Sequence, residues 1–344
     1  MPSNTSIVYF KHPTEFPVVG EHFGPKTDPD FRPVLKDGEF LTRNLVFSLD
    51  PYMRGKMRDS SKKSYSPAYE IGKPLDSRGV GEVIESKNDK YPVGSIVHAF
   101  VGWEEYSVVT ANSPTQIISD ARESKLPLSA YVGVLGMPGL TAYGSLKDIG
   151  KPKAGETIFI SAASGAVGQL AGQLAKAWGL TVIGSAGSDD KVDFLLKEVG
   201  FDHAFNYKTR TTQEALSEFA PNGIDIYFEN VGGETLEAAL NHLNTHGRII
   251  ACGMISQYNT TQPYGIKNLG LVVGKRLTIR GFIVSDFHEQ YSEDFFREVK
   301  ALLLENKIVY RVDEANGVGA APEAFVGMLQ GKNFGKQVVK VADL

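Results

Sequence analysis

Residues 157–191, TIFISAASGAVGQLAGQLAKAWGLTVIGSAGSDDK, decide the fold of this chain. The stretch opens with an apolar, β-rich run at 157–160, which predicts a buried strand. A turn of small residues follows, in which Ala162, Gly165 and Gly168 form the pattern A-x-x-G-x-x-G, and small and apolar residues then recur at helical spacing. A strand, turn and helix of this kind let the backbone approach a pyrophosphate and direct helix N–H groups at it. The alternative is a turn that only packs a helix onto a sheet.

The second β-rich run, at 181–184, ends where a dinucleotide fold distinguishes its two nicotinamide cofactors. An NAD site places Asp or Glu at the end of this strand, where the carboxylate accepts hydrogen bonds from ribose hydroxyls. Here the strand runs into the residues SAGS at 185–188, without a carboxylate at its tip. Ser188 and Lys191 could bind a 2′-phosphate, so the sequence favours NADP(H). Alternatively, the two aspartates between them cap the next helix and the lysine is an ordinary surface cation.

The length and composition indicate a globular protein of two domains. The chain has 344 residues, of which 42% are hydrophobic and 22% charged, and a net charge of −4. This charge gives no basic surface for nucleic acid or an acidic membrane. No apolar run approaches the roughly 18 residues of a membrane span, and the N-terminus lacks a basic segment followed by an apolar core. We therefore expect a cytoplasmic protein without nucleic-acid or membrane partners.

Residues 1–130 differ from the middle of the chain. Short β-like runs are separated there by Pro, Gly, Asp and Asn, with little helical periodicity, and they lie at 39–48, 78–85, 95–100 and 106–110. This pattern predicts an irregular antiparallel barrel. Within it, Pro51 fixes a turn before Tyr52 and Arg54, which we expect to be exposed. A tyrosine after such a turn either takes part in chemistry or only packs its ring.

A glycine and proline kink at 135–143 leads into an α/β pattern. Strand-like runs at 157–161, 181–184, 204–207, 224–230, 247–252 and 277–283 alternate with helix-like runs at 166–178, 189–198, 211–219 and 234–243. Six strands with crossover helices predict a doubly wound parallel sheet, whose ligands bind at the carboxyl ends of the strands. Polar and small residues follow four of these strands, at 206–208, 229–233, 252–258 and 282–284. We expect them to fix the ribose, phosphate and carboxamide groups of a nicotinamide dinucleotide.

Nine motifs along the chain carry a family resemblance. They are DPYMR, LGMPGLTAY, SAASGAVG, AGSDDK, FNYKT, YFENVGGE, CGMISQYN, GFIV and the closing GMLQGKNFGKQVVK. Together they resemble the zinc-independent medium-chain reductases, in the group of prostaglandin reductase, leukotriene B4 12-hydroxydehydrogenase and plant alkenal double-bond reductase. The resemblance runs from about Leu45 to Val341 and implies a Rossmann NADP-binding domain at 131–299. It also implies a GroES-like β-barrel substrate domain at 1–130 with 300–344, and a homodimer.

The resemblance also implies which residues contact the cofactor. By motif position these contacts fall on Gly165, Ala166, Val167, Lys191, Tyr207, Asn230, Cys252, Gly253, Ile255, Ser256, Tyr258, Phe282, Ile283, Val284 and Asn333. The strand, turn and helix argument adds Gly168 and Ser188 to this set. Because Asn333 lies near the C-terminus, we expect the last segment of the chain to return to the first domain.

The implied activity is the NADPH-dependent reduction of the carbon–carbon double bond of α,β-unsaturated aldehydes and ketones, so the expected partner is a small-molecule substrate. Hydride goes to the β-carbon and charge collects as an enolate on the carbonyl oxygen, so the protein must orient the alkene and donate a hydrogen bond to that oxygen. A neutral tyrosine, with a reference pKa near 10, is a suitable donor. Tyr258 is the first candidate and Tyr52 the second, although a ribose hydroxyl could serve as well.

The sequence predicts no metal site. In place of the Gly-His-Glu ligand motif of zinc-dependent alcohol dehydrogenases, residues 72–81 read GKPLDSRGVG, without His or Cys. Cys252 is the only cysteine, which excludes an internal disulfide and a multi-cysteine zinc site. His242 and His246 have the spacing of a helical ligand pair, but no third ligand accompanies them.

Two other functions remain open at this point. The protein could be a quinone reductase or a dehydrogenase of a hydroxylated lipid, which would use the same cofactor for other chemistry. It could also be a non-catalytic NADPH-binding sensor.

One structural alternative also remains open. The β-rich run at 271–279 could pair across a two-fold axis of a dimer, or pair within its own sheet.

Overall fold

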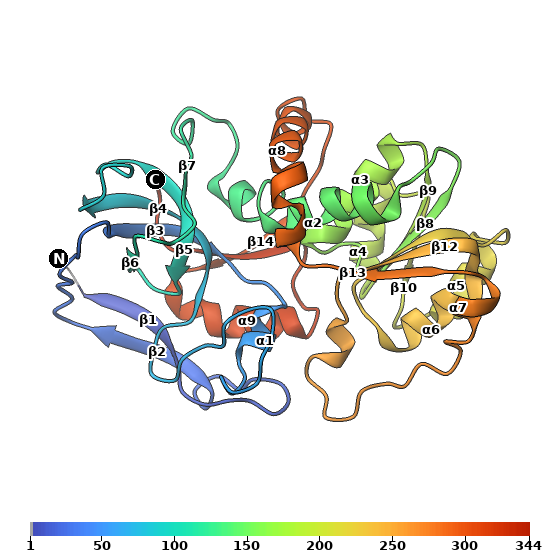
Figure 1. Cartoon of the computed structure of the whole chain (residues 1–344), viewed down its shortest axis with the longest axis horizontal. Coiled ribbons are helices and arrows are strands. Elements are labelled where there is room, and N and C mark those ends of the chain that lie inside the picture. The colour runs from blue at the N-terminus through green and yellow to red at the C-terminus, as the bar shows by residue number, and fades with distance from the viewer. Residues whose placement is uncertain (1–2) are drawn as a thin grey trace. The chain divides into compact units, whose positions relative to one another are not determined.

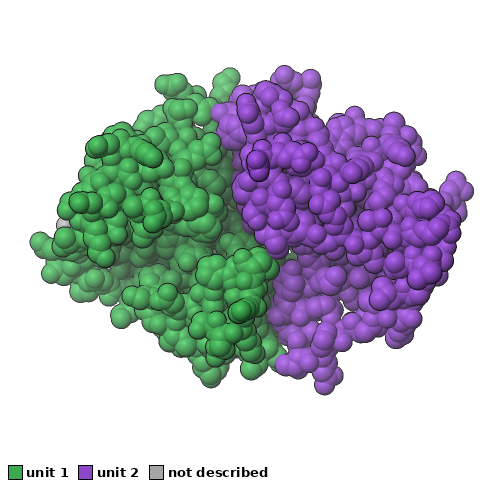
Figure 2. All heavy atoms as spheres, in the orientation of Figure 1, with its two compact units in different colours: residues 1–133, 312–344 green, residues 134–311 purple. Residues whose placement is uncertain are grey.

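The computed structural model describes residues 3–344, which divide into two compact units (Figure 2). Unit 1 contains the chain up to Gly133 together with Val312–Leu344, and unit 2 contains Val134–Arg311. The C-terminal segment therefore belongs to the same unit as the N-terminal part of the chain.

Unit 1 is a mainly antiparallel β structure, and the four predicted short strands form part of it. Its main sheet has the order β14-β15-β3-β4-β5-β7, with β6 paired to β3, and β1 and β2 form a separate antiparallel pair. The strands are β1 (Asn4–Tyr9), β2 (Phe23–Asp28), β3 (Phe40–Ser48), β4 (Asp76–Ser86), β5 (Ile96–Gly102), β6 (Tyr106–Val109), β7 (Gln116–Ile117), β14 (Val312–Asn316) and β15 (Lys336–Lys340). The helical segments are α1 (Met53–Lys56), η1 (Leu128–Val132), η6 (Val318–Ala320) and α9 (Ala321–Leu329). The expected irregular β domain is confirmed, but its sheet is mixed rather than wholly antiparallel, because β14 and β15 pair in parallel.

Aromatic side chains fill the core of unit 1. The indole of Trp103 stacks on Phe47 at a centroid distance of 5.9 Å and meets the edge of Phe325 at 5.4 Å. Its Nε1 donates a hydrogen bond of 3.1 Å to the hydroxyl of Ser77, so the one polar atom of the indole is satisfied. Phe325 lies on α9, so the C-terminal helix is part of this core.

Unit 2 contains the predicted doubly wound sheet (Figure 1), in the strand order β10-β9-β8-β11-β12-β13, all parallel. The strands are β8 (Thr157–Ile160), β9 (Thr181–Ala186), β10 (His203–Asn206), β11 (Ile224–Glu229), β12 (Leu243–Ala251) and β13 (Thr278–Gly281). The helical segments are α2 (Met137–Ser145), η2 (Leu146–Gly150), α3 (Ala166–Ala177), α4 (Asp189–Phe194), η3 (Leu195–Val199), α5 (Thr212–Phe219), α6 (Gly233–His242), η4 (Ile255–Gln257), α7 (Leu271–Gly274), η5 (Val284–Phe287) and α8 (His288–Leu304). All six predicted strands and all four predicted helices are confirmed.

The strand order of unit 2 determines where a ligand can bind. From β8 the chain builds outward to β9 and β10, then returns to β11 on the other side of β8 and continues to β12 and β13. Connections on the two sides of β8 therefore leave in opposite directions, which opens a crevice beyond the carboxyl ends of β8 and β11. The turn with the A-x-x-G-x-x-G pattern lies at this switch point.

The run at 271–279 differs from its predicted β structure. Leu271–Gly274 form the short helix α7, and only Thr278–Gly281 form a strand, which pairs in parallel with β12. This run therefore pairs within its own sheet through one edge of β13. Because β13 is the last strand in the order, one side of it has no partner strand within residues 3–344, and all four of its residues are exposed. Across the residues that the structure describes, no helix has the length and apolar character needed to cross a membrane.

Candidate active site

The turn after β8 has the geometry of a phosphate-binding loop. Its Ala163 N–H donates to the carbonyl of Ser185 at 2.8 Å, which fastens the turn to the end of β9. A Cβ added to Gly168 would lie 2.7 Å from the Cα of Ala163, so only glycine lets helix α3 approach the turn this closely. Gly165 is the N-cap of α3 and has no side chain to accept from the first N–H groups of the helix. An anionic group therefore fits at this helix end.

The end of β9 carries residues suited to a second phosphate. Ser188 is the N-cap of α4, and its hydroxyl bonds the carboxylate of Asp190, which holds the pKa of that carboxyl below its usual range. Lys191, on the first turn of α4, is 7% exposed. Tyr207 follows β10, and its N–H donates to the carbonyl of Ala186 at 3.1 Å. These contacts bring three predicted residues, Ser188, Lys191 and Tyr207, to neighbouring strand ends.

A glycine makes room for the tyrosine at this position. A Cβ added to Gly187 would lie 3.1 Å from the hydroxyl oxygen of Tyr207, so the phenol lies directly beside the Gly187 backbone. Tyr207 remains 49% exposed, which leaves its ring accessible to a ligand. Residues 185–188 carry no carboxylate, so a 2′-phosphate would meet no acidic side chain on this segment.

A buried hydroxyl joins the ends of β8 and β11. The N–H of Asn230 donates to the hydroxyl of Ser161 at 2.9 Å, and its amide Nδ2 donates to the carbonyl of Ser161 at 2.8 Å. This bond uses one of the two N–H groups of Nδ2, so the second N–H and the amide oxygen of Asn230 can face a ligand as donor and acceptor. Ser161 is fully buried, so it orients Asn230 rather than contacting a ligand itself.

Glu229 shapes the turn that follows β11. Its Oε1 accepts hydrogen bonds from the N–H of Val231 at 2.6 Å, the N–H of Gly232 at 2.8 Å and the hydroxyl of Tyr227 at 2.9 Å. The carboxyl is fully buried, and burial raises its pKa. Burial, together with the nearby charge of Glu229, also raises the pKa of the Cys252 thiol to about 12. The thiol is therefore protonated at neutral pH and does not act as a nucleophile.

The loop after β12 lies against the turn after β11. The N–H groups of Gly253 and Ile255 donate to the carbonyls of Glu229 and Asn230 at 3.0 and 3.1 Å. The hydroxyl of Ser256 donates to the carbonyl of Val231 at 2.5 Å. The structure thus brings together the predicted residues Asn230, Cys252, Gly253, Ile255 and Ser256 at one edge of the sheet.

Tyr258 ends this loop and folds back over it. Its hydroxyl oxygen accepts a hydrogen bond of 3.2 Å from the N–H of Met254 and lies 2.9 Å from the position of a Cβ on Gly253. An N–H that donates to a phenol oxygen polarises the phenol and strengthens its O–H as a donor. The position at the carboxyl edge of the sheet suits a donor to a developing oxyanion.

Three further predicted residues follow β13 directly. Phe282, Ile283 and Val284 are half-buried. The ring of Phe282 packs on Phe287 at 5.0 Å, and the N–H of Ile283 donates to the carboxylate of Asp286 at 3.0 Å. These contacts fix the segment that leads from the sheet into α8.

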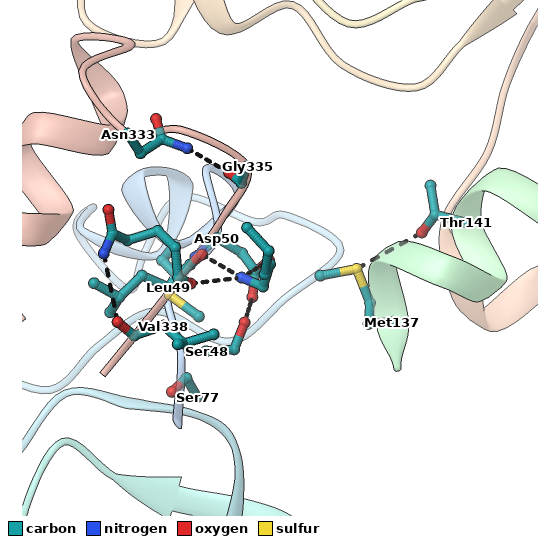
Figure 3. Close-up of polar contacts among 12 residues, drawn as sticks. Ser48, Leu49, Asp50, Ser77, Met137, Thr141, Asn333, Gly335 and Val338 are labelled. Atoms are coloured by element: carbon teal, nitrogen blue, oxygen red, sulfur yellow. Dashed lines mark hydrogen bonds and ion pairs between the residues drawn. The ribbon is translucent and has the colours of Figure 1, made fainter. Parts of the chain in front are cut away.

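Two of the predicted residues, Tyr52 and Asn333, belong to unit 1. Tyr52 is the N-cap of α1, and burial, with smaller contributions from the carboxylates of Asp50 and Asp76, raises its pKa well above the usual value. Its hydroxyl therefore remains protonated throughout the neutral range. The amide Nδ2 of Asn333 donates to the carbonyl of Gly335 at 2.8 Å (Figure 3).

Arg54 is buried, contrary to its predicted exposure. Only 8% of the residue is accessible, and its Nη2 donates to the carbonyls of Glu15 at 2.8 Å and Pro13 at 3.2 Å. The residue therefore fastens the loop before β2 to helix α1. The turn signal at Pro51 gave no information on this distant partner.

The histidines do not form the helical pair that their spacing allows. Helix α6 ends at His242, and His246 lies on β12 with a left-handed φ of 66°. The two imidazoles therefore do not project from one helix. No group of three or more His, Cys, Asp or Glu side chains within residues 3–344 has a geometry that could hold a metal ion.

Four buried residues of the site were not assigned from the sequence. Ser161 and Glu229 hold the strand ends of unit 2, and Asp50 and Lys336 form an ion pair in unit 1. The position of Glu229 at a strand end predicted a contact with the cofactor. The structure instead shows its carboxylate holding the backbone of the turn that follows. Nothing in the local sequence connects residues 50 and 336.

Two family models match the chain. A model described as zinc-binding dehydrogenase matches residues 166–301, and a model described as the N-terminal domain of oxidoreductase matches residues 8–117. The first covers most of unit 2 and the second covers most of the N-terminal segment of unit 1.

Individual relatives match over most or all of the chain. A zinc-type alcohol dehydrogenase-like protein of Schizosaccharomyces pombe is 50% identical, with 100% of both chains covered. The NADP(+)-dependent 2-alkenal reductase of Nicotiana tabacum is 47% identical, with 88% of each chain covered. Among solved structures, CurA from Vibrio vulnificus in complex with NADPH has a TM-score of 0.90 at 39% identity, covering 99% of this chain and 100% of that one.

Proposed function

This chain belongs to the zinc-independent group of the medium-chain dehydrogenase/reductase family, and from that premise we propose that it reduces the carbon–carbon double bond of α,β-unsaturated aldehydes and ketones with NADPH. The observation that carries the proposal is the hydroxyl of Tyr258, held by the Met254 N–H at the carboxyl edge of a dinucleotide-type sheet. A similar chain, the 2-alkenal reductase of Nicotiana tabacum, is named for this chemistry.

The residues of unit 2 fit NADPH in three places. The turn before α3, with Gly165, Ala166, Val167 and Gly168, would hold the pyrophosphate on backbone N–H groups. Ser188, Lys191 and Tyr207 would hold the 2′-phosphate at the ends of β9 and β10. The nicotinamide end would meet Asn230, residues 252–258 and residues 282–284, and Asn333 of unit 1 would contribute an amide. Bound NADPH supplies the hydride.

The chain itself must orient the substrate and stabilise charge. Reduction at the β-carbon moves charge to the carbonyl oxygen, where an O–H donor lowers the energy of the transition state. Tyr258 and Tyr52 are the proposed donors, and burial keeps Tyr52 in the protonated form that donation requires. Neither role requires a proton to leave the tyrosine, so the α-carbon proton can come from solvent.

The proposed function also assigns a task to each part of the chain. In this proposal unit 2 carries most of the cofactor contacts, and unit 1 contributes Tyr52 and Asn333. We propose further that the protein is a cytoplasmic homodimer, with the exposed edge strand β13 at the interface. There, Ile279 is 42% exposed and Val273 of the neighbouring helix is 81% exposed. Light scattering of the purified protein and of an Ile279→Lys variant tests this arrangement.

One experiment tests the activity. NADPH absorbance is followed with an alkenal, an alkenone, a quinone and an allylic alcohol, the last with NADP(+), and each product is identified by mass. A gain of two hydrogens at the double bond with the carbonyl retained supports the proposal. Reaction of only the quinone, or of only the alcohol, would make the protein a quinone reductase or a hydroxy-lipid dehydrogenase. Binding of NADPH without any turnover would indicate a non-catalytic sensor.

A further inference from the structure

One buried lysine joins two distant segments of unit 1. Lys336 is 3% exposed, and its Nζ donates to the carbonyl of Leu49 at 2.6 Å, to Oδ1 of Asp50 at 3.0 Å and to the carbonyl of Gln337 at 3.0 Å. An ammonium has three N–H donors, so all of them are used. The second carboxylate oxygen of Asp50 accepts from the hydroxyl of Ser48 (Figure 3). The cluster is therefore complete without water or ligand.

One side of this cluster leads directly to Tyr52. Asp50 begins the turn into α1, where its carbonyl accepts from the N–H of Met53 at 3.1 Å. Pro51 fixes the backbone between the ion pair and the tyrosine. The position of Tyr52 thus depends on Asp50, whose carboxylate is held by Lys336, and on Pro51, whose φ is fixed by its ring.

The other side leads to Asn333. The side chain of Asn333 bonds the carbonyl of Gly335, the residue before the lysine, and Gly335 has a left-handed φ of 88°. The N–H of Phe334 donates to the carboxylate of Asp313 at 2.8 Å, and the amide of Gln337 donates to the carbonyl of Asp313 at 3.0 Å. The loop that carries Asn333 is therefore fastened on one side to β14 and on the other to Lys336.

We propose that Lys336 is a positioning residue whose buried ammonium sets both the turn that carries Tyr52 and the loop that carries Asn333. The proposed substrate contact and the proposed cofactor contact of unit 1 are thereby aligned with each other. The inference rests on the proposed function, which gives Tyr52 and Asn333 their roles.

The energetics favour alignment over stability as the role of this pair. Moving a lysine and an aspartate into the interior costs free energy that their attraction only partly returns, and apolar residues of similar volume often stabilise a fold equally well. Burial lowers the pKa of Lys336, and the charge of Asp50 opposes this. An apolar pair could not fix the carbonyls of Leu49 and Gln337, whereas an ammonium orients both.

The test compares Lys336→Met with two single-function variants. For Asn333→Ala we expect about tenfold weaker NADPH binding with kcat nearly unchanged, and for Tyr52→Phe about tenfold lower kcat with NADPH binding unchanged, each a lost hydrogen bond to a polar partner. Lys336→Met is expected to show both losses at a temperature well below its Tm. NADPH affinity is measured by fluorescence titration, and kcat with the substrate found in the panel. Lys336→Arg, which retains the charge and the donors, should recover part of each loss.

A matched control breaks another largely buried ion pair. Arg248 and Glu156 are 18% and 17% exposed and lie at the amino ends of the unit 2 strands, away from the proposed contacts. Arg248→Met should lower Tm without changing NADPH affinity or kcat. A loss of both parameters in Arg248→Met similar to that in Lys336→Met would overturn the inference, because destabilisation alone would then explain it.

A second variant applies if Lys336→Met does not fold because Asp50 is left without its partner. Asp50→Asn with Lys336→Met removes both charges and is expected to fold, yet it still lacks the bonds to Leu49 and Gln337. It should lose both NADPH affinity and kcat. Values within twofold of the wild type for both would overturn the inference, as would a loss of kcat alone. If the wild type binds NADPH but reduces no enone, the proposed function fails, and an unchanged NADPH affinity in these variants would separately overturn the alignment role.

Discussion

The residues proposed for the site are held in different ways within unit 2 and within unit 1. In unit 2 many contacts join backbone groups at adjacent strand ends, as where the N–H of Ala163 donates to the carbonyl of Ser185 and the N–H of Gly253 to the carbonyl of Glu229. In unit 1 a buried ion pair joins Asp50 and Lys336, which are 286 positions apart in the chain. A site made from strand ends tolerates changes in many side chains but not in its glycines. A site aligned by buried polar groups depends on single side chains and on their protonation.

The largest expected effect concerns the buried polar groups of unit 1. Burial raises the pKa of Glu104 to about 7, although Ser107 and Asn4 donate hydrogen bonds to its carboxylate. Because the folded state holds this proton more tightly than the unfolded state, the stabilising contribution is present below about pH 4.5 and is lost as the pH rises through about 7. The free energy of unfolding should fall by about 3 kcal/mol over this range from this group.

Thermal unfolding from pH 4.5 to pH 8 measures this effect. Glu104→Gln should remove most of the decline in Tm, whereas Glu85→Gln, at an exposed position of the same unit, should leave the decline as it is in the wild type. An equal decline in Glu104→Gln and in the wild type would show that the interior of unit 1 does not respond to pH through this residue.

The second prediction tests which unit supplies the hydrogen-bond donor to the carbonyl oxygen of the substrate. Tyr258→Phe removes a phenol at the sheet edge of unit 2, and we expect kcat to fall about 100-fold, as for the loss of one oxyanion donor. NADPH affinity should change little, since the ring remains. Steady-state kinetics with an enone and a fluorescence titration separate the two parameters.

The control is a tyrosine of the same unit outside the site. Tyr143 is fully buried and donates to Glu298 at 2.7 Å, so Tyr143→Phe should lower Tm and leave kcat unchanged. An unchanged kcat in Tyr258→Phe, together with a large loss in Tyr52→Phe, would move the donor from unit 2 to unit 1.

A third prediction tests the dependence of unit 2 on its glycines. In Gly168→Ala the new Cβ would lie within 2.8 Å of backbone atoms of Ala162 and Ala163, which cannot move without shifting the turn. NADPH binding should weaken about 30-fold, which corresponds to about 2 kcal/mol of overpacking. Gly274→Ala places its Cβ in open space and serves as the matched control. Unchanged NADPH binding in Gly168→Ala would show that the turn does not determine cofactor affinity.

The smallest predicted effect concerns cofactor choice. Lys191→Ala removes a cation at the end of β9, and we expect NADPH to bind about tenfold more weakly, as for one hydrogen bond to a charged group. NADH, which lacks the 2′-phosphate, should bind as it does to the wild type. Titrations with both cofactors check this, and an equal loss for both would remove Lys191 from the phosphate site. Lys197→Ala, on an exposed part of the following segment, is the control.

The sequence was sufficient for the parts of the molecule that depend on short-range patterns. Strand periodicity and the turn at 162–168 predicted the sheet of unit 2 and its binding edge, because both arise within single βα units. The family resemblance is confirmed by relatives matching over the full chain. The helix at Leu271–Gly274 was wrongly predicted as β structure, since four apolar and glycine residues carry no decisive periodicity.

The remaining features could not be predicted because their partners are distant. The local sequence predicts that Arg54 is exposed, but the loop at Glu15 covers it in the folded unit. The local sequence gives no sign that Lys336 is buried, because it lies beside Asp50 only once β15 has paired with β3. Burial of this kind is a property of the assembled unit rather than of a local motif.

The buried thiol of Cys252 bears on the chemical durability of the protein. Unsaturated aldehydes alkylate thiolates, and a thiol with a pKa of about 12 has a thiolate fraction on the order of 10⁻⁵ at pH 7. Cys252 is the single cysteine of the chain. Under the proposed activity, the protein would meet thiol-reactive enals and enones while presenting them with almost no thiolate of its own.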